Sequence, residues 1–371
     1  NHQKNNQESI ELLKKRKPLF EAGFMHKNGK CYARADILVP SDKDKWDIYE
    51  VKSATSVKEE YLEDISFQKY CYESAGLKID KRFVMHVNNQ YVRQGKVNSG
   101  ELFVSAEVTE EVNTLMSEVP EKIKLLFKII NLDECPEFKK EEEYHEDELG
   151  VHKKDKVWQE NPNSDIFDLY RAGKLALELF NQGILEIKDI PESYHHKLND
   201  KNKIQHKTHS NEEHHYDKGE LNLFIKNLNY PLYFMDFESY NPAIPLYNGL
   251  KPYQQITFQF SVHVVEKKGA KPKHLSFIAE GAEDPRPDFL KQLKKALGEK
   301  GSIVVYNQSF EQTRLKELGA YFPLYQKWVE SVNKRMVDLI VPFRNFAYYH
   351  PKQKGSASLK YVLPVLRGVT Y

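Results

Sequence analysis

The sequence predicts an α/β protein with two sheet-containing domains joined by a helical, polar segment. With 371 residues, the chain exceeds the size that one hydrophobic core usually supports. Short strands separated by turns are expected in the first third of the chain, and long apolar strands in the last third, with helices between them. We therefore predict one domain over residues 1–130, a linker region over 131–225 and a second domain over 226–371.

The overall composition limits the kinds of partner and compartment. The chain has 55 Lys and Arg against 54 Asp and Glu, so its net charge is +1 and any nucleic-acid-binding surface must be local. Three widely spaced cysteines, Cys31, Cys71 and Cys135, argue against a disulfide framework and favour a reducing compartment. No apolar run of 18 residues and no signal-peptide pattern occurs, which favours a cytoplasmic protein without a membrane partner. Because the chain does not begin with Met and stops without a terminating pattern, we expect a fragment at both ends.

The first domain is expected to contain a meander of three strands followed by a helix. The strands are predicted over residues 18–25, 31–39 and 46–52, because apolar residues recur there between turn signals. The helix is predicted over residues 64–72, and a second, longer helix over 108–130 closes the domain.

Polar residues of this predicted meander gather at one point. Glu50 and Lys52 share one face of the third strand, because alternate residues of a strand point the same way, and Asp36 on the neighbouring strand reaches the same place. Gln68 and Tyr72 lie one turn apart on one face of the predicted helix. An acid, a second acid and a lysine in this arrangement are what metal-dependent phosphodiester hydrolysis requires.

This Asp…Glu-x-Lys set, followed by Gln-x-x-x-Tyr, resembles the PD-(D/E)XK nucleases with their restriction-endonuclease-like core, and specifically their RecB-like branch. The resemblance covers about residues 18–95. It implies that Asp36, Glu50 and the carbonyl of Val51 hold Mg²⁺ or Mn²⁺, and that Lys52 orients or activates the attacking water and offsets charge on the scissile phosphate. The catalytic residues that it implies are Asp36, Glu50, Lys52, Gln68 and Tyr72.

Alternatives remain for several of these residues. Asp36, Glu50 and Lys52 could instead form a surface ion-pair ladder across two strands. Glu21 could approach the metal or pair with Arg34. Relatives of this nuclease branch often bind an iron–sulfur cluster through cysteines after the core, but only Cys135 follows here, so no iron–sulfur cluster is expected.

The linker region is expected to combine a helical part with a solvated part. A helix over 165–181 and the segment 183–191 resemble the short helical module that trails the nuclease domain in relatives, or they form a plain packing element between two domains. Histidines between His195 and His215 sit in a Lys/Asn/Glu-rich stretch whose spacing fits no zinc pattern. We expect this stretch to be a solvated linker.

The second domain is organised around an apolar strand that leads into Asp236 and Glu238. These acids are one position apart, so they share a face of the strand, and paired carboxylates are best stabilised by a divalent cation. Capping or turn chemistry after a core strand is the alternative. Further strands are predicted over 254–265, 273–278 and 302–306, which is how an RNase H-like sheet begins.

Together with the segment from Asn307 to Glu311, the acidic pair resembles the first two motifs of the DnaQ-like (DEDD) 3′–5′ exonucleases of the RNase H fold. The resemblance implies a mixed sheet flanked by helices, with Asp236, Glu238 and Glu311 holding two Mg²⁺ or Mn²⁺ ions about 4 Å apart. Glu311 stands where this family has Asp, and Asp338 looks like the aspartate that commonly follows the second motif. The third motif does not appear before the chain stops, so we expect this domain to be truncated at its C-terminal end.

Basic and aromatic side chains near these motifs are candidates for phosphate contacts and base stacking. They are Tyr240, Lys251, Tyr253, Phe258, Asn307, Arg344 and Lys360. The tandem order of the two cores resembles a bacterial family of uncharacterised fusion proteins. We predict a metal-dependent nuclease acting on DNA, in repair, processing or defence against foreign DNA. The alternatives are a nuclease acting on RNA and a nucleic-acid-binding scaffold whose sites have decayed.

Overall fold

The chain folds into a mixed α/β structure, which confirms the predicted class. The computed structural model describes residues 2–132, 164–211 and 213–369. Cys135, on which the iron–sulfur prediction rests, lies outside the described residues.

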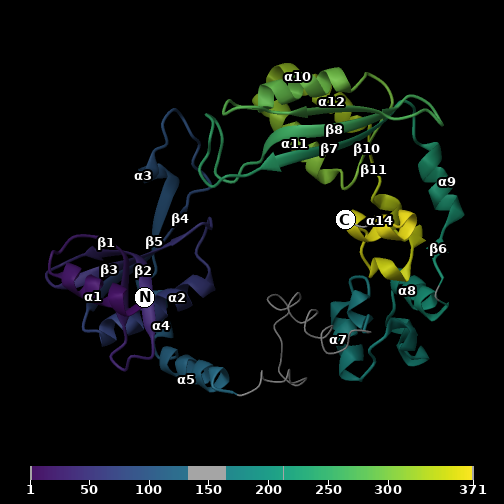
Figure 1. Cartoon of the computed structure of the whole chain (residues 1–371). Coiled ribbons are helices and arrows are strands. Elements are labelled where there is room, and N and C mark those ends of the chain that lie inside the picture. Colours follow the sequence, from purple (N-terminus) through teal and green to yellow (C-terminus); the bar gives the residue numbers. More distant parts are fainter. Residues whose placement is uncertain (1, 133–163, 212, 370–371) are drawn as a thin grey trace. The chain divides into compact units, whose positions relative to one another are not determined.

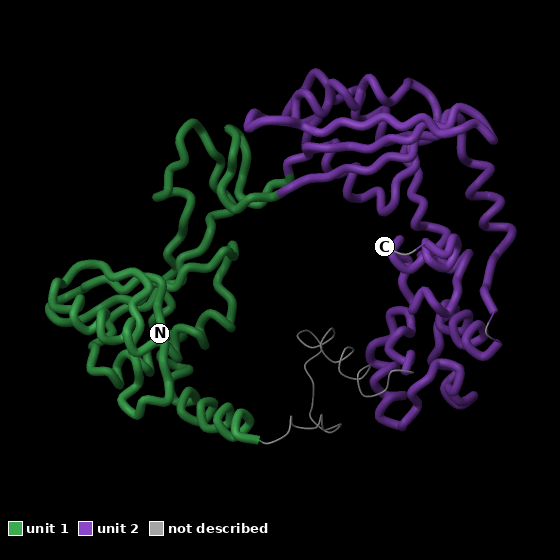
Figure 2. The backbone as a smooth tube through the Cα atoms, viewed as in Figure 1, with its two compact units in different colours: residues 1–138, 241–255 green, residues 139–240, 256–371 purple. Residues whose placement is uncertain are grey.

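Two compact units make up the molecule (Figure 2). The first comprises residues 1–138 and 241–255, and the second comprises residues 139–240 and 256–371. Each unit contains one five-stranded sheet and its own hydrophobic core. The segment 241–255 therefore belongs to the first unit, although its neighbours in the sequence belong to the second.

The first unit is built on the sheet order β1-β2-β3-β4-β5 (Figure 1). β1, β2 and β3 run antiparallel, β4 is parallel to β3, and β5 is antiparallel to β4. Its elements are α1 (His2–Leu13), β1 (Leu19–Met25), β2 (Tyr32–Pro40), β3 (Lys45–Lys52), α2 (Glu59–Ser74), β4 (Lys78–Val87), α3 (Ser99–Leu102), β5 (Phe103–Glu107), α4 (Thr109–Leu115) and α5 (Val119–Ile130).

α2 forms the crossover between the parallel strands β3 and β4 and packs against the sheet. Ile65 and Tyr72 of α2 are fully buried with Leu38, Ile48 and Val84 of the strands. Burying each of these side chains contributes roughly 1.5–3 kcal/mol, so this layer fixes the position of the polar face of α2 relative to β3.

The helix predicted over residues 108–130 is two helices, α4 and α5. Pro120 lies in the first turn of α5. Proline is favoured at a helix start, where no internal partner is lost, but it cannot continue a preceding helix because it has no backbone N–H. The prediction of a single helix was therefore wrong, because α4 ends at Leu115 and α5 begins at Val119.

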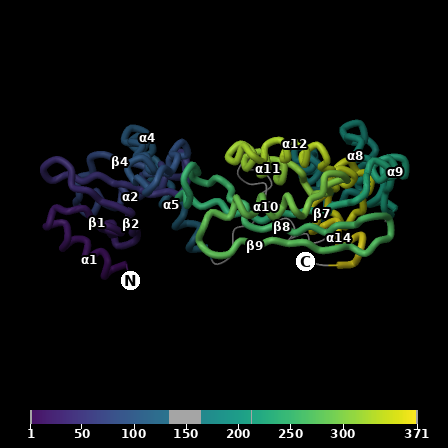
Figure 3. Tube along the Cα trace, turned by 90° about the horizontal axis from the view of Figure 1, so that it is seen from above, coloured from purple at the N-terminus to yellow at the C-terminus, as the bar shows by residue number. Residues whose placement is uncertain are grey.

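The second unit contains the sheet β11-β10-β7-β8-β9, in which β7, β8 and β9 are antiparallel and β10 and β11 run parallel to β7. Figure 3 shows β9 beyond β8 at the edge of this sheet. The elements are η1 (Ile166–Asp168), α7 (Gly173–Asn181), η2 (Ile187–Asp189), η3 (Glu192–Lys197), α8 (Asp200–Asn211), β6 (His215–Tyr216), α9 (Lys218–Lys226), β7 (Leu232–Tyr240), β8 (Ile256–Val265), β9 (Lys273–Ile278), α10 (Arg286–Ala296), β10 (Ser302–Val305), α11 (Ser309–Tyr321), η4 (Pro323–Tyr325), α12 (Gln326–Lys334), β11 (Met336–Asp338), α13 (Val341–Arg344), β12 (Tyr348–Tyr349), η5 (Pro351–Gln353) and α14 (Leu359–Arg367).

Helices α10, α11 and α12 cover one face of this sheet (Figure 1), and their buried residues share one core with it. On β7, Met235 and Phe237 point into that core, whereas Phe234, Asp236 and Glu238 are exposed on the other face. The strand continues to Tyr240, so the two acids lie within β7. The alternative that they cap a turn after the strand is therefore wrong.

The histidine-rich stretch is folded where we expected a solvated linker. Residues 200–211 form α8, and Asn202, Gln205 and Thr208 are buried. The amide nitrogen of Gln205 donates to the backbone oxygen of Asp168 at 2.8 Å, so the buried polar side chain is satisfied. Composition misled the prediction here because this helix buries hydrogen-bonded polar groups rather than an apolar stripe.

Among the described residues, no helix has the length and apolar character that crossing a membrane requires.

Candidate functional site

The first candidate site is centred on Lys52 at the end of β3. The Lys52 ammonium donates to Oε1 of Glu50 and to Oδ2 of Asp64, each at 2.7 Å. On the neighbouring strand, Oδ2 of Asp36 accepts a 2.6 Å hydrogen bond from the backbone N–H of Val51. β2, β3 and α2 thus bring residues far apart in the sequence into one polar cluster.

Gln68 completes this cluster from α2. Its Nε2 donates to Oε2 of Glu50 at 2.7 Å, so both oxygens of Glu50 accept from side chains. The Oε1 atom of Gln68 is buried and has no hydrogen-bond partner. We call Asp36, Glu50, Lys52, Asp64 and Gln68 the Lys52 cluster.

The Lys52 cluster carries more negative than positive charge. Glu50 is 7% exposed, and burial is the main reason why the pKa of its carboxyl is raised. The hydrogen bonds from Lys52 and Gln68 lower this pKa, whereas the negative charges of Asp64 and Asp36 raise it. The net result is a pKa above the ordinary value. Burial lowers the pKa of Lys52, but its bonds to Asp64 and Glu50 outweigh this and hold the pKa above the ordinary value. The Lys52 ammonium therefore stays protonated between Glu50 and Asp64, and Asp36 adds a third carboxylate nearby that bonds to the backbone N–H of Val51.

Asp64 is the member of this cluster that the sequence analysis missed. It precedes Gln68 by four residues, and Tyr72 follows Gln68 by four, so the three lie on one face of α2. That spacing is the signal that could have identified it.

Tyr72 lies deeper than the other predicted residues. It is fully buried, its hydroxyl accepts from the backbone N–H of Ala35 at 2.7 Å, and it donates to the carbonyl oxygen of Ala22. Burial raises the pKa of this phenol above its ordinary value. Tyr72 thus joins β1 to β2 next to Asp36 and positions that strand.

Four further residues of the first unit have defined places. Glu21 pairs with Arg34, with Oε2 and Nε 2.7 Å apart, which supports its structural alternative. Val51 is 39% exposed at the strand edge. Cys31 and Cys71 are free and buried, and burial raises the pKa of the Cys71 thiol to about 12.

The second candidate site is centred on Glu311 in the first turn of α11. Glu311 is 3% exposed, and its Oε2 is buried without a hydrogen-bond partner. Burial, with additional repulsion from Asp236 and Asp338, raises the pKa of this carboxyl to about 7. Glu311, Asp236 and Asp338 form what we call the Glu311 cluster.

Asp338 is held by the backbone at the start of α11. Its Oδ1 accepts from the backbone N–H groups of Asn307 at 2.8 Å and Ile340 at 3.2 Å, and its Oδ2 accepts from Gln308 at 3.2 Å. Asn307 has φ +73°, a left-handed conformation that asparagine tolerates better than most residues. Its Oδ1 accepts from Nη2 of Arg344 at 3.3 Å.

The remaining predicted residues do not all gather at the Glu311 cluster. Glu238 lies on the same face of β7 as Asp236, opposite Gln259 of β8. The ring of Tyr240 packs edge-on against Phe258 with centroids 5.7 Å apart. Lys360 is exposed in the first turn of α14.

Lys251 and Tyr253 belong to the segment 241–255 of the first unit, not to the domain in which they were predicted. The Tyr253 hydroxyl donates to the carbonyl oxygen of Ser53, the residue after Lys52. Its ring packs against the small core of Val87, Tyr91 and Leu102. Tyr253 therefore supports the end of β3 through its hydroxyl and its packed ring.

Both clusters offer the hard oxygen donors that Mg²⁺ and Mn²⁺ prefer. As they stand, no group of three or more His, Cys, Asp or Glu in the described part of the chain is arranged as a metal site. The donor chemistry nevertheless fits a divalent cation, because the Lys52 cluster has excess negative charge and the Glu311 cluster has a buried carboxylate oxygen without a partner.

Comparison with known proteins finds a family model and relatives that match parts of this chain. Residues 233–358 match a family model described as "Domain of unknown function (DUF2779)". The "Uncharacterized protein UU173" of Ureaplasma parvum serovar 3 is 32% identical over 157 residues, covering 39% of this chain and 22% of that protein. The "Uncharacterized protein MG366 homolog" of Mycoplasma pneumoniae is 30% identical over 144 residues, covering 36% of this chain and 22% of that protein. The matches thus span 22% of the length of each of these relatives, and no solved structure matches the chain.

Proposed function

We propose that this chain is a metal-dependent nuclease that hydrolyses phosphodiester bonds of DNA, with a RecB-like PD-(D/E)XK site in the first unit and a DnaQ-like site of the RNase H fold in the second. The observation that carries the proposal is that Glu50 bonds to both Lys52 of β3 and Gln68 of α2, while Asp36 of β2 bonds to the backbone N–H of Val51, the residue between Glu50 and Lys52. The β3-α2-β4 crossover and the mixed order of the second sheet support the two folds.

In the first unit, Asp36, Glu50 and the carbonyl of Val51 would hold Mg²⁺ or Mn²⁺. Such an ion, when bound, neutralises charge on the phosphate and lowers the pKa of bound water. Lys52 remains an ammonium ion because its pKa is raised, so it contacts the anionic phosphate and does not accept a proton from water. Gln68 keeps Glu50 oriented through its 2.7 Å hydrogen bond.

In the second unit, Asp236, Glu238 and Glu311 would provide the ligands. Glu311 has a pKa of about 7, so it loses its proton close to neutral pH and becomes a carboxylate when a cation approaches. Asp338, fixed by three backbone N–H groups, holds the turn before α11 and thereby the direction of Glu311.

A cleavage assay tests the proposal. End-labelled single- and double-stranded DNA, with matching RNA, are incubated with the full chain in Mg²⁺, Mn²⁺ or EDTA. We expect cleavage of DNA that EDTA abolishes, and a loss of at least about 100-fold in Lys52→Ala, in Asp236→Ala/Glu238→Ala, or in both. Preferred cleavage of the RNA would keep the chemistry and change the substrate.

Matched variants separate the two units. Lys58→Ala removes an exposed lysine near the same helix, and Glu266→Ala/Glu330→Ala removes two exposed acids of the second unit, so both should retain full activity. Loss in only one of the two site variants assigns catalysis to that unit. If the native chain cleaves nothing in either metal, the proposal fails.

A second candidate function is a nucleic-acid-binding scaffold without turnover. It is favoured by one observation: Oδ2 of Asp36 and both oxygens of Glu50 already accept hydrogen bonds from protein groups. Under this alternative, the chain binds nucleic acid equally well in EDTA and in Mg²⁺, and no cleavage product accumulates.

A further inference from the structure

Two hollows flank the short strand pair of β6 and β12 in the second unit. One has a volume of about 490 Å³ and lies beside α8 and β6, and the other has a volume of about 380 Å³ and lies beside η5 and α14. The basic and aromatic side chains that line the first hollow include Lys203, Lys207, His214 and Tyr216. In the second, they are His350, Lys352, Lys360 and Tyr361.

A series of stacked rings connects the two hollows. The ring of His214, which lines the first, lies 5.3 Å from Tyr216 and 6.0 Å from Tyr348. It also lies 6.5 Å from His350, which lines the second. Tyr216 is 46% exposed and Tyr361 is 40% exposed, so aromatic faces at both ends are open to a ligand.

The lysines of these hollows are poorly neutralised. Among the described residues, Lys207, Lys352 and Lys360 form no ion pair with an acid, and Lys203 lies 3.6 Å from Asp200. Glu213 lines the first hollow, and no Asp or Glu is among the described residues that line the second. Burial lowers the pKa of His350, and the nearby Lys352, His214 and His209 lower it further.

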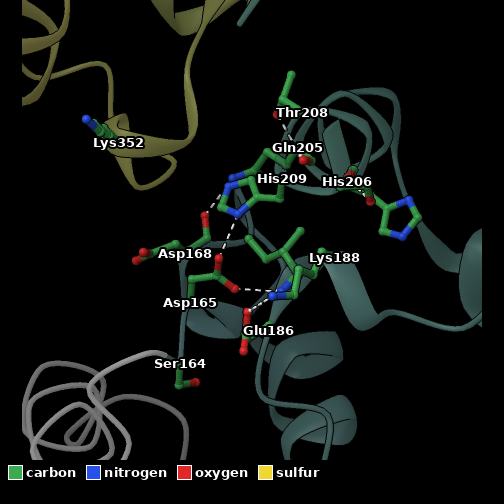
Figure 4. Close-up of polar contacts among 12 residues, drawn as sticks. Ser164, Asp165, Asp168, Glu186, Lys188, Gln205, His206, Thr208, His209 and Lys352 are labelled. Atoms are coloured by element: carbon green, nitrogen blue, oxygen red, sulfur yellow. Dashed lines mark hydrogen bonds and ion pairs between the residues drawn. The ribbon is translucent and has the colours of Figure 1, made fainter. Parts of the chain in front are cut away.

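A rigid polar network supports this surface from beneath. Nδ1 of His209 and Oδ2 of Asp165 are 2.6 Å apart, and Nε2 of Gln205 donates to the Tyr349 hydroxyl at 3.1 Å. Figure 4 shows Asp165 directed at His209 of α8, while Lys352 points away from this network. α8 is therefore fixed on its buried side, and its lysines face the hollow on the other.

The surface is also connected to the Glu311 cluster. The Tyr306 hydroxyl donates to the carbonyl oxygen of Ala357 at 2.5 Å, which ties the segment before α14 to the end of β10. Tyr306 directly precedes Asn307, where the turn to α11 begins. A strand held by Lys360 would thus approach residues that position Glu311.

We propose that these two hollows form one binding surface for single-stranded nucleic acid, in which the lysines contact phosphates and the exposed rings stack on bases. Stacking rings beside unpaired cations are the arrangement by which proteins hold single strands without reading sequence. The proposal relies on the proposed function only for the class of ligand, and the surface uses none of the residues of the two carboxylate clusters.

Fluorescence anisotropy tests this proposal with the full chain, a fluorescein-labelled 20-nucleotide single-stranded DNA, and EDTA to prevent cleavage. The variant is Lys207→Glu/Lys352→Glu, with one lysine from each hollow. We expect binding about tenfold weaker or more, and a salt slope reduced by about 1.4, since each lost contact to a single strand accounts for about 0.7. Tyr216→Leu should weaken single-strand binding several-fold and leave duplex binding unchanged.

The control is Lys268→Glu/Lys271→Glu, which makes the same change of charge on exposed lysines between β8 and β9. It should bind like the native chain, as should Lys207→Arg/Lys352→Arg, which keeps the charge. Equal weakening in both Glu variants would overturn the proposal, because it would reflect net charge alone. Competition by polyglutamate as strong as by DNA, or tighter binding of the duplex, would overturn it as well.

The same measurement separates this surface from the nuclease proposal. Binding in EDTA requires no turnover, and Lys52→Ala leaves the surface intact. A native chain that binds the oligonucleotide through Lys207 and Lys352 but never cleaves it would retain the surface and reject the nuclease.

Discussion

Each of the two clusters buries one glutamate, but the two carboxylates have different hydrogen-bond partners. Glu50 is 7% exposed and Glu311 is 3% exposed, so their burial is similar. Glu50 accepts hydrogen bonds from the Lys52 ammonium and the Gln68 amide, whereas Oε2 of Glu311 has no partner. Burial raises the pKa of both carboxyls, and the comparison teaches that hydrogen-bond donors such as those around Glu50 oppose this shift.

Because of this difference, a bound cation would replace different interactions in the two units. In the Lys52 cluster, a metal ion must compete with an ammonium ion that is already bonded to Glu50 and Asp64. In the Glu311 cluster, a metal ion would meet a carboxylate whose ionisation is opposed by burial and by Asp236 and Asp338. We therefore expect the second cluster to respond to added metal more strongly in stability, and the first to depend more on its own lysine.

The largest effect should come from removing Lys52. Lys52→Met leaves the buried Glu50 without its ammonium partner, so the free energy of unfolding of the first unit should fall by about 3 kcal/mol, as measured by urea denaturation at pH 7. The double variant Glu50→Gln/Lys52→Met should recover most of this loss.

Lys69→Met is the matched control for this experiment. Lys69 pairs with Glu73 on the same helix, but Glu73 is 40% exposed, so its loss should cost no more than about 1 kcal/mol. Equal losses in Lys52→Met and Lys69→Met would mean that the Lys52 cluster is a surface ion-pair ladder.

The next effect concerns the pH dependence set by Glu311. Its pKa is raised from 4.5 to about 7, so the folded state keeps a proton that the unfolded state releases. Glu311 therefore contributes about 3 kcal/mol to the free energy of unfolding below pH 4.5. This contribution falls as the pH rises toward 7 and is lost above pH 7. Glu311→Gln should therefore stabilise the chain at pH 8 and flatten this part of its profile.

Added Mg²⁺ sharpens the same comparison. At pH 8, Mg²⁺ should raise the melting temperature of the native chain more than that of Glu311→Gln, because the variant lacks one charged ligand of this cluster. Glu330→Gln, at an exposed position of α12, should behave like the native chain in both respects. If the stability of the native chain depended on pH between 4.5 and 8 in the same way as that of Glu311→Gln, the raised pKa of Glu311 would be contradicted.

The smallest effect is expected at Asn307. Asn307→Gly suits the left-handed φ of +73° and should change stability by less than about 1 kcal/mol, whereas Asn307→Ala should cost about 1 kcal/mol. Thermal unfolding measures both. If Asn307→Gly folds normally but loses cleavage, the side-chain amide has a role in the site; if Ala and Gly are equivalent in stability, the turn does not require this backbone conformation.

Local pattern determined much of the architecture before the structure was known. The strands at 18–25, 31–39 and 46–52 correspond to β1, β2 and β3, and the segment 273–278 coincides with β9. Strand alternation was enough to place Glu50 with Lys52 and Asp236 with Glu238, since a period of two residues fixes which side chains share a face. The class of the fold and the two pairs Glu50–Lys52 and Asp236–Glu238 could thus be read from spacing.

Tertiary structure decided what those spacings leave open. Asp64 enters the Lys52 cluster only because α2 packs across β3, and Tyr253 supports Ser53 only because the segment 241–255 folds with the first unit. The polar helix α8 is stable because Asp165, Asp168 and Tyr349, distant in sequence, satisfy its buried side chains. The raised pKa of Glu311 has the same origin: sequence names the carboxylates, but desolvation and the distance between charges exist only after folding.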